Sequence, residues 1–158
     1  AIAALAVALA LAAGALAAQD TPGNLTLTLP EAHALTQQAY AAGDLALAHA
    51  LALRLLEADP EDARALLVIA ATAPALGQPR TGRLAGKQAW AAAREAPLLR
   101  YEIARFTARA ALDEGRPDAA QFWLRRAVDV APDAASTART ARDFGDIRKG
   151  RRLSYELD

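Results

Sequence analysis

A glycine followed about seventeen residues later by a proline occurs three times in this chain, between stretches of alanine-rich helical pattern. The three stretches run from Gly43 to Pro60, from Gly77 to Pro97 and from Gly115 to Pro132. Glycine ends helices because it adopts left-handed backbone angles, and proline ends one helix or opens the next. The spacing therefore predicts three helix–turn–helix pairs, and stacked pairs form scaffolds that hold other proteins without a catalytic site.

Composition restricts the remaining classes of protein. The 158 residues suffice for one helical domain, and the formal net charge of zero argues against a nucleic-acid binder, which normally carries a basic excess. The absence of cysteine excludes disulfides, thiol catalysis, cysteine metal sites and a cysteine-linked lipid anchor.

Catalytic and cofactor motifs are not found in the sequence. The two histidines, His33 and His49, stand in helical patterns without a ligand motif of carboxylates around them, so we expect ordinary helix-face histidines and no metal. No glycine-rich phosphate loop and no serine–histidine–acid set can be placed. We therefore expect a protein that is not an enzyme and that needs no cofactor.

The N-terminal residues have the pattern of a secretory signal peptide. Ala1 to Leu16 is an uninterrupted run of Ala, Ile, Leu, Val and Gly, and Ala15-x-Ala17 provides small residues for cleavage. The run is near the short limit for a bilayer span, so we favour export over a retained membrane anchor. We expect residues 1–17 to be the signal peptide, its basic first region missing from this sequence, and residues 18–29 to be a linker.

The first predicted helix pair begins at Pro30, turns at Gly43-Asp44 and continues from Leu45 to Ala58. In the second pair, Asp59 is expected to cap a helix that has Pro60 at its first position and Asp62 in its first turn. Pro74 is expected near the end of that helix, and Gly77 in the turn. Hydrophobic periodicity places these residues inward in the two pairs: Ala32, Leu35, Ala39, Ala48, Leu51, Leu55, Leu66, Ile69, Ala70, Ala73, Leu84, Ala85, Ala89 and Ala92.

The third pair spans 98–114 and 118–130, joined by the turn at Gly115 to Pro117. A seventh helix, from about Ala131 to Ile147, lacks a partner and is expected to cap the stack. Phe122 and Trp123 are adjacent and cannot both face inward, so one of them should be partly exposed or buried by a neighbouring helix. Tryptophan is enriched in binding hot spots, but packing between repeats is the interpretation we favour for these rings.

The periodicity of residues 30–148 resembles the tetratricopeptide repeat. Its small position is matched by Ala48, Ala85 and Ala120, while smaller residues replace the family's tryptophan and aromatic positions. Further matches are Ala32, Leu35-Thr36, Ala39, Ala52 and Pro60 in the first repeat, and Ala104, Thr107-Ala108, Ala111, Leu124 and Pro132 in the third. The resemblance implies an all-α, right-handed superhelical stack of about three divergent helix pairs and a C-terminal capping helix. The alternative is an ordinary alanine-rich helical bundle.

In such a stack the first helix of each pair lines a concave groove. That face would contain the candidate partner-binding residues His33, Gln37, Tyr40, Arg64, Leu67, Arg105 and Arg109. Arg105 and Arg109 are four residues apart on one helix, so together they could hold a carboxylate of a client. The alternative, which we favour, is a solvated face with local salt bridges, for example to Glu102.

The C-terminal residues change in character. After a basic stretch, Leu153, Tyr155 and Leu157 alternate with polar residues, which is the pattern of an outer-membrane barrel strand. We expect residues 149–158 to begin a β-barrel that is truncated in this sequence.

Together with the third repeat (101–132), residues 143–157 resemble the periplasmic N-terminal part of the surface lipoprotein assembly modifier family of Gram-negative outer-membrane proteins. The resemblance implies an exported, periplasmic protein associated with the outer membrane. Its partner would be a protein or peptide client, such as a lipoprotein, with no nucleic acid, and it would meet the membrane only through the barrel. The alternative is a free-standing periplasmic repeat scaffold in envelope or cell-wall assembly.

Overall fold

A computed structural model describes residues 5–6 and 26–150 of the chain, and this part is all-α apart from one short strand pair. The helices are α1 (Leu29–Ala41), α2 (Leu45–Ala58), α3 (Ala63–Thr72), α4 (Pro79–Ala92), α5 (Pro97–Asp113), α6 (Pro117–Asp129) and α7 (Ala134–Arg148). Strand β1 (Leu5–Ala6) pairs antiparallel with β2 (Thr26–Leu27). Most of the predicted signal peptide and linker, and residues 151–158 of the predicted strand, lie outside the described residues.

The three predicted glycine turns are confirmed, and they share one backbone geometry. Gly43, Gly77 and Gly115 have φ angles of 79°, 78° and 77°, in the left-handed region that glycine adopts without strain. In each turn, the amide after the glycine donates to a carbonyl five residues earlier, as in Asp44 to Ala39, Gln78 to Ala73 and Arg116 to Ala111. This bond is the one that closes a Schellman-type helix end. The chain therefore reverses direction three times by the same device.

Side chains and prolines start the helices. Thr28 and Glu31 form a capping box at α1, while Asp44 and Asp133 accept backbone N–H bonds at α2 and α7. Helices α4, α5 and α6 instead begin with a proline, whose missing N–H has no helical partner at that position.

The predicted start of α3 is wrong by three residues. Asp62, and not Asp59, caps this helix, because its Oδ1 accepts the backbone N–H of Arg64 and Ala65 at 3.0 Å. Asp59 instead ends α2 and accepts the N–H of Glu61, so that Pro60 lies in the turn between the helices. Helix α3 therefore begins only after Asp62, whose side chain accepts hydrogen bonds from the first free amides of the helix.

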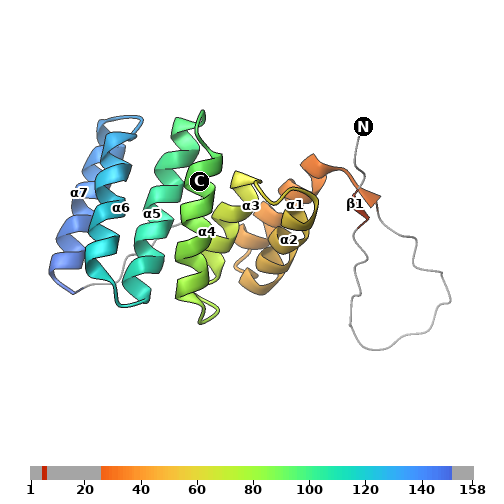
Figure 1. Ribbon diagram of the computed structural model, residues 1–158, viewed down its shortest axis with the longest axis horizontal. Coiled ribbons are helices and arrows are strands. Elements are labelled where there is room, and N and C mark those ends of the chain that lie inside the picture. The colour runs from red at the N-terminus through yellow and green to blue at the C-terminus, as the bar shows by residue number, and fades with distance from the viewer. Residues whose placement is uncertain (1–4, 7–25, 151–158) are drawn as a thin grey trace.

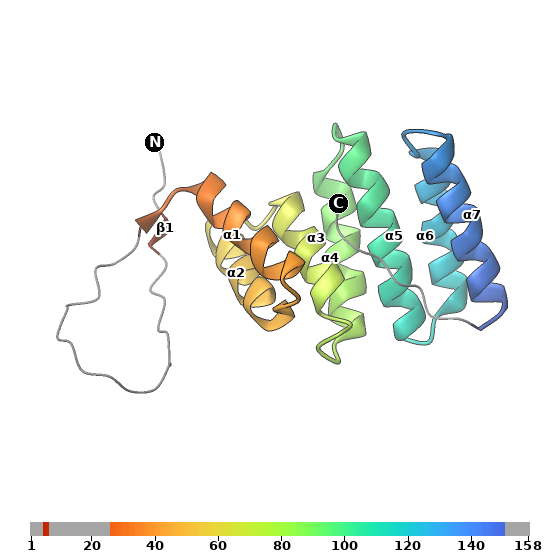
Figure 2. The same cartoon turned by 180° about the vertical axis from the view of Figure 1, so that it is seen from behind.

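The helices form a row in two layers (Figure 1). Helices α2, α4 and α6 lie toward one face, and α1, α3, α5 and α7 lie toward the other, which is seen in Figure 2. Each helix packs against the next in sequence, and α3 also contacts α1 and α5 across the pairs. Among the described residues, no helix is both long enough and apolar enough to span a bilayer.

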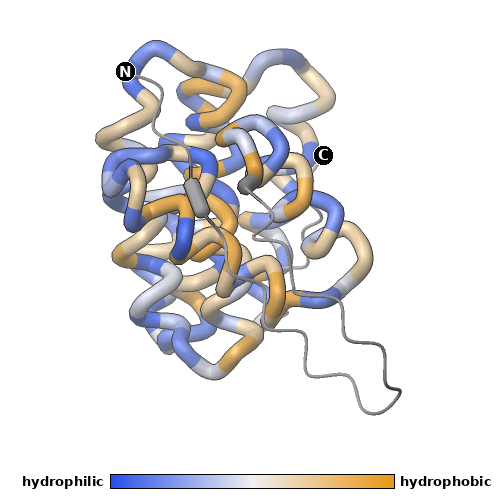
Figure 3. Tube along the Cα trace, turned by 90° about the vertical axis from the view of Figure 1, so that its right-hand side faces the viewer, coloured by the Kyte–Doolittle hydropathy of each residue, from blue (hydrophilic) through white to orange (hydrophobic). Residues whose placement is uncertain are grey.

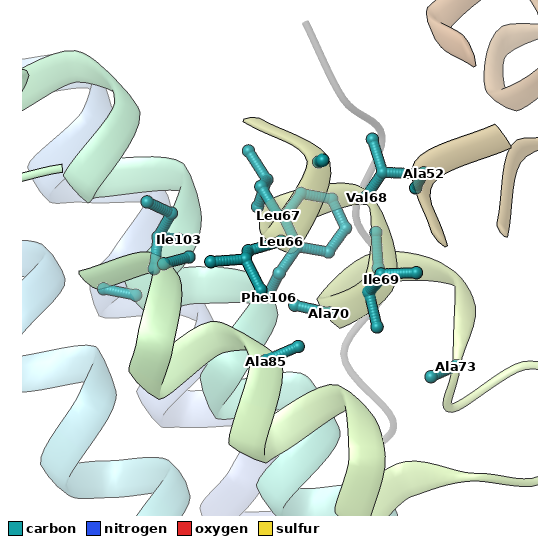
Figure 4. Close-up of a cluster of buried hydrophobic side chains, with 14 of the residues drawn as sticks. Ala52, Leu66, Leu67, Val68, Ile69, Ala70, Ala73, Ala85, Ile103 and Phe106 are labelled. Carbon is teal, nitrogen blue, oxygen red and sulfur yellow. The ribbon is translucent and has the colours of Figure 1, made fainter. Parts of the chain in front are cut away.

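The core is centred on α3 and is made mostly of small side chains. All eight residues from Ala65 to Thr72 are buried, as expected for a helix with neighbours on every side. Phe106 of α5 is fully buried and points toward Leu66 and Ala70 of α3 (Figure 4). Burial of such a ring contributes about 1.5–3 kcal/mol. Along the chain, apolar segments alternate with hydrophilic ones, in keeping with helices that bury apolar side chains and expose polar ones (Figure 3).

Two residues predicted to face inward on α4 are exposed. Leu84 is 44% exposed and Ala92 is also exposed, whereas Gly82, Ala85, Gly86 and Ala89 form the buried face. The pattern of apolar residues predicted that Leu84 faces inward. The inward face of α4, however, carries only glycine and alanine. Its neighbours come too close to admit a leucine.

Gly86 is the closest of these approaches. A β-carbon at this position would lie 2.9 Å from Cβ of Thr107 on α5, which is closer than real carbon atoms approach. Thr107 cannot yield easily, because it is fully buried and its hydroxyl donates to the carbonyl of Ile103 at 2.6 Å. The separation between α4 and α5 is therefore set by the absence of a side chain at Gly86.

We predict that Gly86→Ala destabilises the protein by about 1–3 kcal/mol, because the added methyl group overpacks the contact with Thr107. The matched control is Gly145→Ala in α7, where a β-carbon meets nothing within 4 Å. That substitution should raise stability by up to about 1 kcal/mol through helix propensity. Urea unfolding of both variants measures the difference, and equal effects would contradict the proposed close contact.

Candidate functional site

An open depression of about 510 Å³ lies where the three helix pairs meet. Its walls come from α1, from the start of α3 and the linker before it, and from the junction of α4 with α5. The lining residues are His33, Asp59, Glu61, Asp62, Ala63, Arg64, Ala92, Ala93, Glu95, Ala96 and Leu99. Because each pair supplies part of the wall, the depression exists only when the pairs are stacked.

One hydrogen-bonded contact fixes the wall between the first two pairs. Nε2 of His33 lies 2.8 Å from Oδ2 of Asp62, while Oδ1 of Asp62 caps α3. A single carboxylate thus joins α1 to the first turn of α3. Both side chains are largely buried, which limits the competition from water that weakens exposed pairs.

The depression is acidic. Four of its lining residues are carboxylates, namely Asp59, Glu61, Asp62 and Glu95, against the one guanidinium of Arg64. Asp59 and Asp62 are engaged with backbone amides, whereas the side chains of Glu61, before α3, and Glu95, between α4 and α5, are exposed. Negative potential in a concave surface attracts cationic ligands and raises their local concentration.

The predicted groove residues are only partly brought together. His33 and Arg64 line the depression, while Gln37 is exposed and Tyr40 half-buried further along α1. Leu67 is wrong as a groove residue, since it is 6% exposed. It belongs to the core because α3, unlike α1, is surrounded by other helices from Ala65 to Thr72.

Arg105 is also wrong as an accessible residue. It is 4% exposed, and its Nε lies 3.5 Å from Oδ2 of Asp143 on α7, with Glu102 at 3.5 Å from Nη1. The predicted pair with Arg109 is therefore not an open clamp, and Arg109 itself lies beside Asp113 at 3.9 Å. The capping helix α7 covers the face of α5 that the repeat pattern assigned to the groove.

Buried polar groups join α5 to α7, and we call them the polar seam. They belong to Tyr101, Arg105, Ser136, Thr140 and Asp143. The hydroxyl of Tyr101 donates to the carbonyl of Ser136 at 2.9 Å and lies 3.3 Å from Oγ1 of Thr140. Arg105 also stands 5.5 Å from the centroid of the Tyr101 ring. Because these groups are buried, they hold α7 in one register.

The two histidines have separate roles. His33 contacts Asp62, whereas Nδ1 of His49 lies 2.8 Å from Oγ1 of Thr72. The Thr72 hydroxyl donates its one hydrogen to Val68, so His49 is the donor in this contact. Burial lowers the pKa of His49. Within residues 5–6 and 26–150, no three His, Cys, Asp or Glu side chains are grouped as metal ligands.

The sequence analysis missed the acidic wall of the depression. Asp59 was interpreted only as a helix cap and Asp62 only as a first-turn charge, and Glu95 was not considered. The signal was present, because linkers between pairs lie at the mouth of a groove in a stacked array. Charged residues in those linkers were therefore better candidates than residues within the helices.

No protein-family model matches the chain, and no curated protein sequence is significantly similar to it. Membership of the tetratricopeptide family or of the surface lipoprotein assembly modifiers stays a prediction.

We predict that Arg105→Met destabilises the protein by about 3–5 kcal/mol, because it removes the guanidinium that lies beside the buried Asp143 carboxylate. The double variant Arg105→Met with Asp143→Leu should lose less, since the buried Asp143 carboxylate is removed as well. Arg109→Met is the control, with an expected change of at most about 1 kcal/mol for a half-exposed pair. Urea unfolding tests this, and strictly additive losses in the double variant would show that the two side chains are not coupled.

Proposed function

We propose that this chain is a protein-binding scaffold built as a tetratricopeptide-like superhelical stack, with no catalytic activity of its own. The acidic depression at the junction of the three pairs is the surface that holds a client polypeptide. The observation that carries this proposal is the composition of the wall, to which α1, α3, α4 and α5 all contribute. Such a surface is a product of stacking, which is how repeat proteins form their binding faces.

The charge of the depression specifies the client segment. The exposed carboxylates of Glu61 and Glu95 favour lysine or arginine side chains, and Ala92, Ala96 and Leu99 offer apolar contact between them. The client we propose is an extended or helical segment with basic residues. This differs from the acidic client that an open Arg105–Arg109 pair would have favoured.

We also propose that the scaffold is exported and is the periplasmic arm of an outer-membrane barrel protein that assists export of surface lipoproteins. The support is the pattern of a signal peptide in residues 1–17 and the alternation of Leu153, Tyr155 and Leu157. A free-standing periplasmic scaffold is the competing function.

The client proposal predicts binding of a short fluorescent peptide of alternating lysine and alanine to the full chain. Glu61→Lys with Glu95→Lys should weaken this binding about tenfold, because two attractive charges become repulsive. The binding should also weaken as salt rises, since these carboxylates are exposed. Fluorescence anisotropy at several salt concentrations measures both effects.

The matched control is Glu57→Lys with Asp129→Lys. These residues are exposed and lie outside the depression, so the control changes the net charge by the same amount. Equal weakening by the two double variants would leave only a general charge effect and would refute the proposed site.

The barrel proposal predicts that the gene continues past the codon for Asp158 into about a dozen alternating segments of about ten residues, separated by turns. Sequencing the encoding DNA beyond that codon is the measurement. A stop codon shortly after it would instead support the free-standing scaffold.

A further inference from the structure

A cluster of aromatic rings and arginines lies on α4, α5 and α6, and none of its residues is among those that line the depression. Trp90 of α4 meets Trp123 of α6 edge to face, with ring centroids 5.7 Å apart. Phe122 meets Trp123 at the same separation. We call these three rings, with Arg100 and Arg126, the aromatic–arginine patch. Of its rings, Phe122 is 49% exposed and Trp90 is half-buried, so the patch reaches the surface.

Both arginines of the patch stand against rings. The guanidinium carbon of Arg100 is 4.1 Å from the Trp90 centroid. That of Arg126 is 5.3 Å from the same centroid, 4.7 Å from Phe122 and 5.5 Å from Trp123. These distances fall within the range of cation–π attraction, which holds each guanidinium against the rings.

The two cations are not neutralised by carboxylates. Arg54, Arg83, Arg105 and Arg109 each form an ion pair, yet neither arginine of the patch has one with any described residue. Nε of Arg100 is also buried without a hydrogen-bond acceptor within the described part of the chain. Both guanidiniums lie at the Trp90 ring on half-buried side chains, so a carboxylate bound at their exposed parts would offset the two positive charges.

We propose that the aromatic–arginine patch is a second interaction surface, which binds an acidic segment of a partner polypeptide. Carboxylates bind the guanidinium edges with charge-assisted hydrogen bonds, and an apolar side chain of the partner packs on Phe122. Two unpaired arginines suit one or two carboxylates. A nucleic acid would need a longer series of cations for its phosphates, and the net charge of the chain is zero.

The test is a titration of the full chain with a short peptide of glutamate and alanine that carries one phenylalanine and no tryptophan. Both tryptophans of the protein belong to the patch, so saturable binding should change the intrinsic fluorescence. Arg100→Gln with Arg126→Gln should weaken the binding at least tenfold. The control Arg80→Gln with Arg142→Gln removes the same charge at exposed positions elsewhere and should weaken it less than twofold.

Two further arms separate the proposal from a loss of folding and from other ligands. Phe122→Ala removes a half-exposed ring and should weaken binding about threefold while circular dichroism stays unchanged. The lysine–alanine peptide should not displace the acidic one. A negative result at this surface therefore leaves the proposal for the depression unaffected, and the reverse also holds. The proposal is overturned by an absence of saturable binding, by equal weakening in the control, or by tighter binding of an oligothymidine of equal charge.

Discussion

Thr107 of α5 lies against the backbone of α4 at Gly86, and no side chain separates the two helices there. The rest of the packing depends on this contact. With α4 and α5 so close, the neighbouring residue Phe106 reaches across to α3 and fills the centre of the core. Alanines are the most numerous of the other core residues, and each contributes little, so the stack gains its stability from many short contacts at small separation.

Charge is distributed over the molecule in three distinct ways. Inside, Arg105 and Asp143 pair in a polar seam that fixes the capping helix. In the depression, exposed carboxylates outnumber cations, and on α4, α5 and α6 the arginines of the patch stand on rings without counter-ions. A formal net charge of zero therefore conceals two surfaces of opposite sign. We propose that the first surface selects basic segments and the second acidic ones.

Local signals in the sequence predicted much of the fold. The bounds of α2 agree to the residue, and the turns at Gly43, Gly77 and Gly115 follow from glycine's backbone freedom. The candidate site was predicted less well, because it depends on which helices cover which faces. Periodicity identifies one apolar side of a helix, but it could not show that α3 is enclosed or that α7 lies over Arg105. Exposure of Leu84 likewise depends on a separation between helices that no single helix encodes.

The burial of Ala65 to Thr72 in α3 has a consequence for cooperativity. Helix α3 has neighbours on both sides along the row, whereas the first and last helices have neighbours on one side only. In such a one-dimensional array the free energy of local opening rises from the ends toward the middle. A client that bridges α1, α3 and α5 would couple an end of the array to its centre. Binding would then suppress fraying of α1. Slower amide exchange in α1, at the end of the row, would therefore show that the depression is occupied by a client.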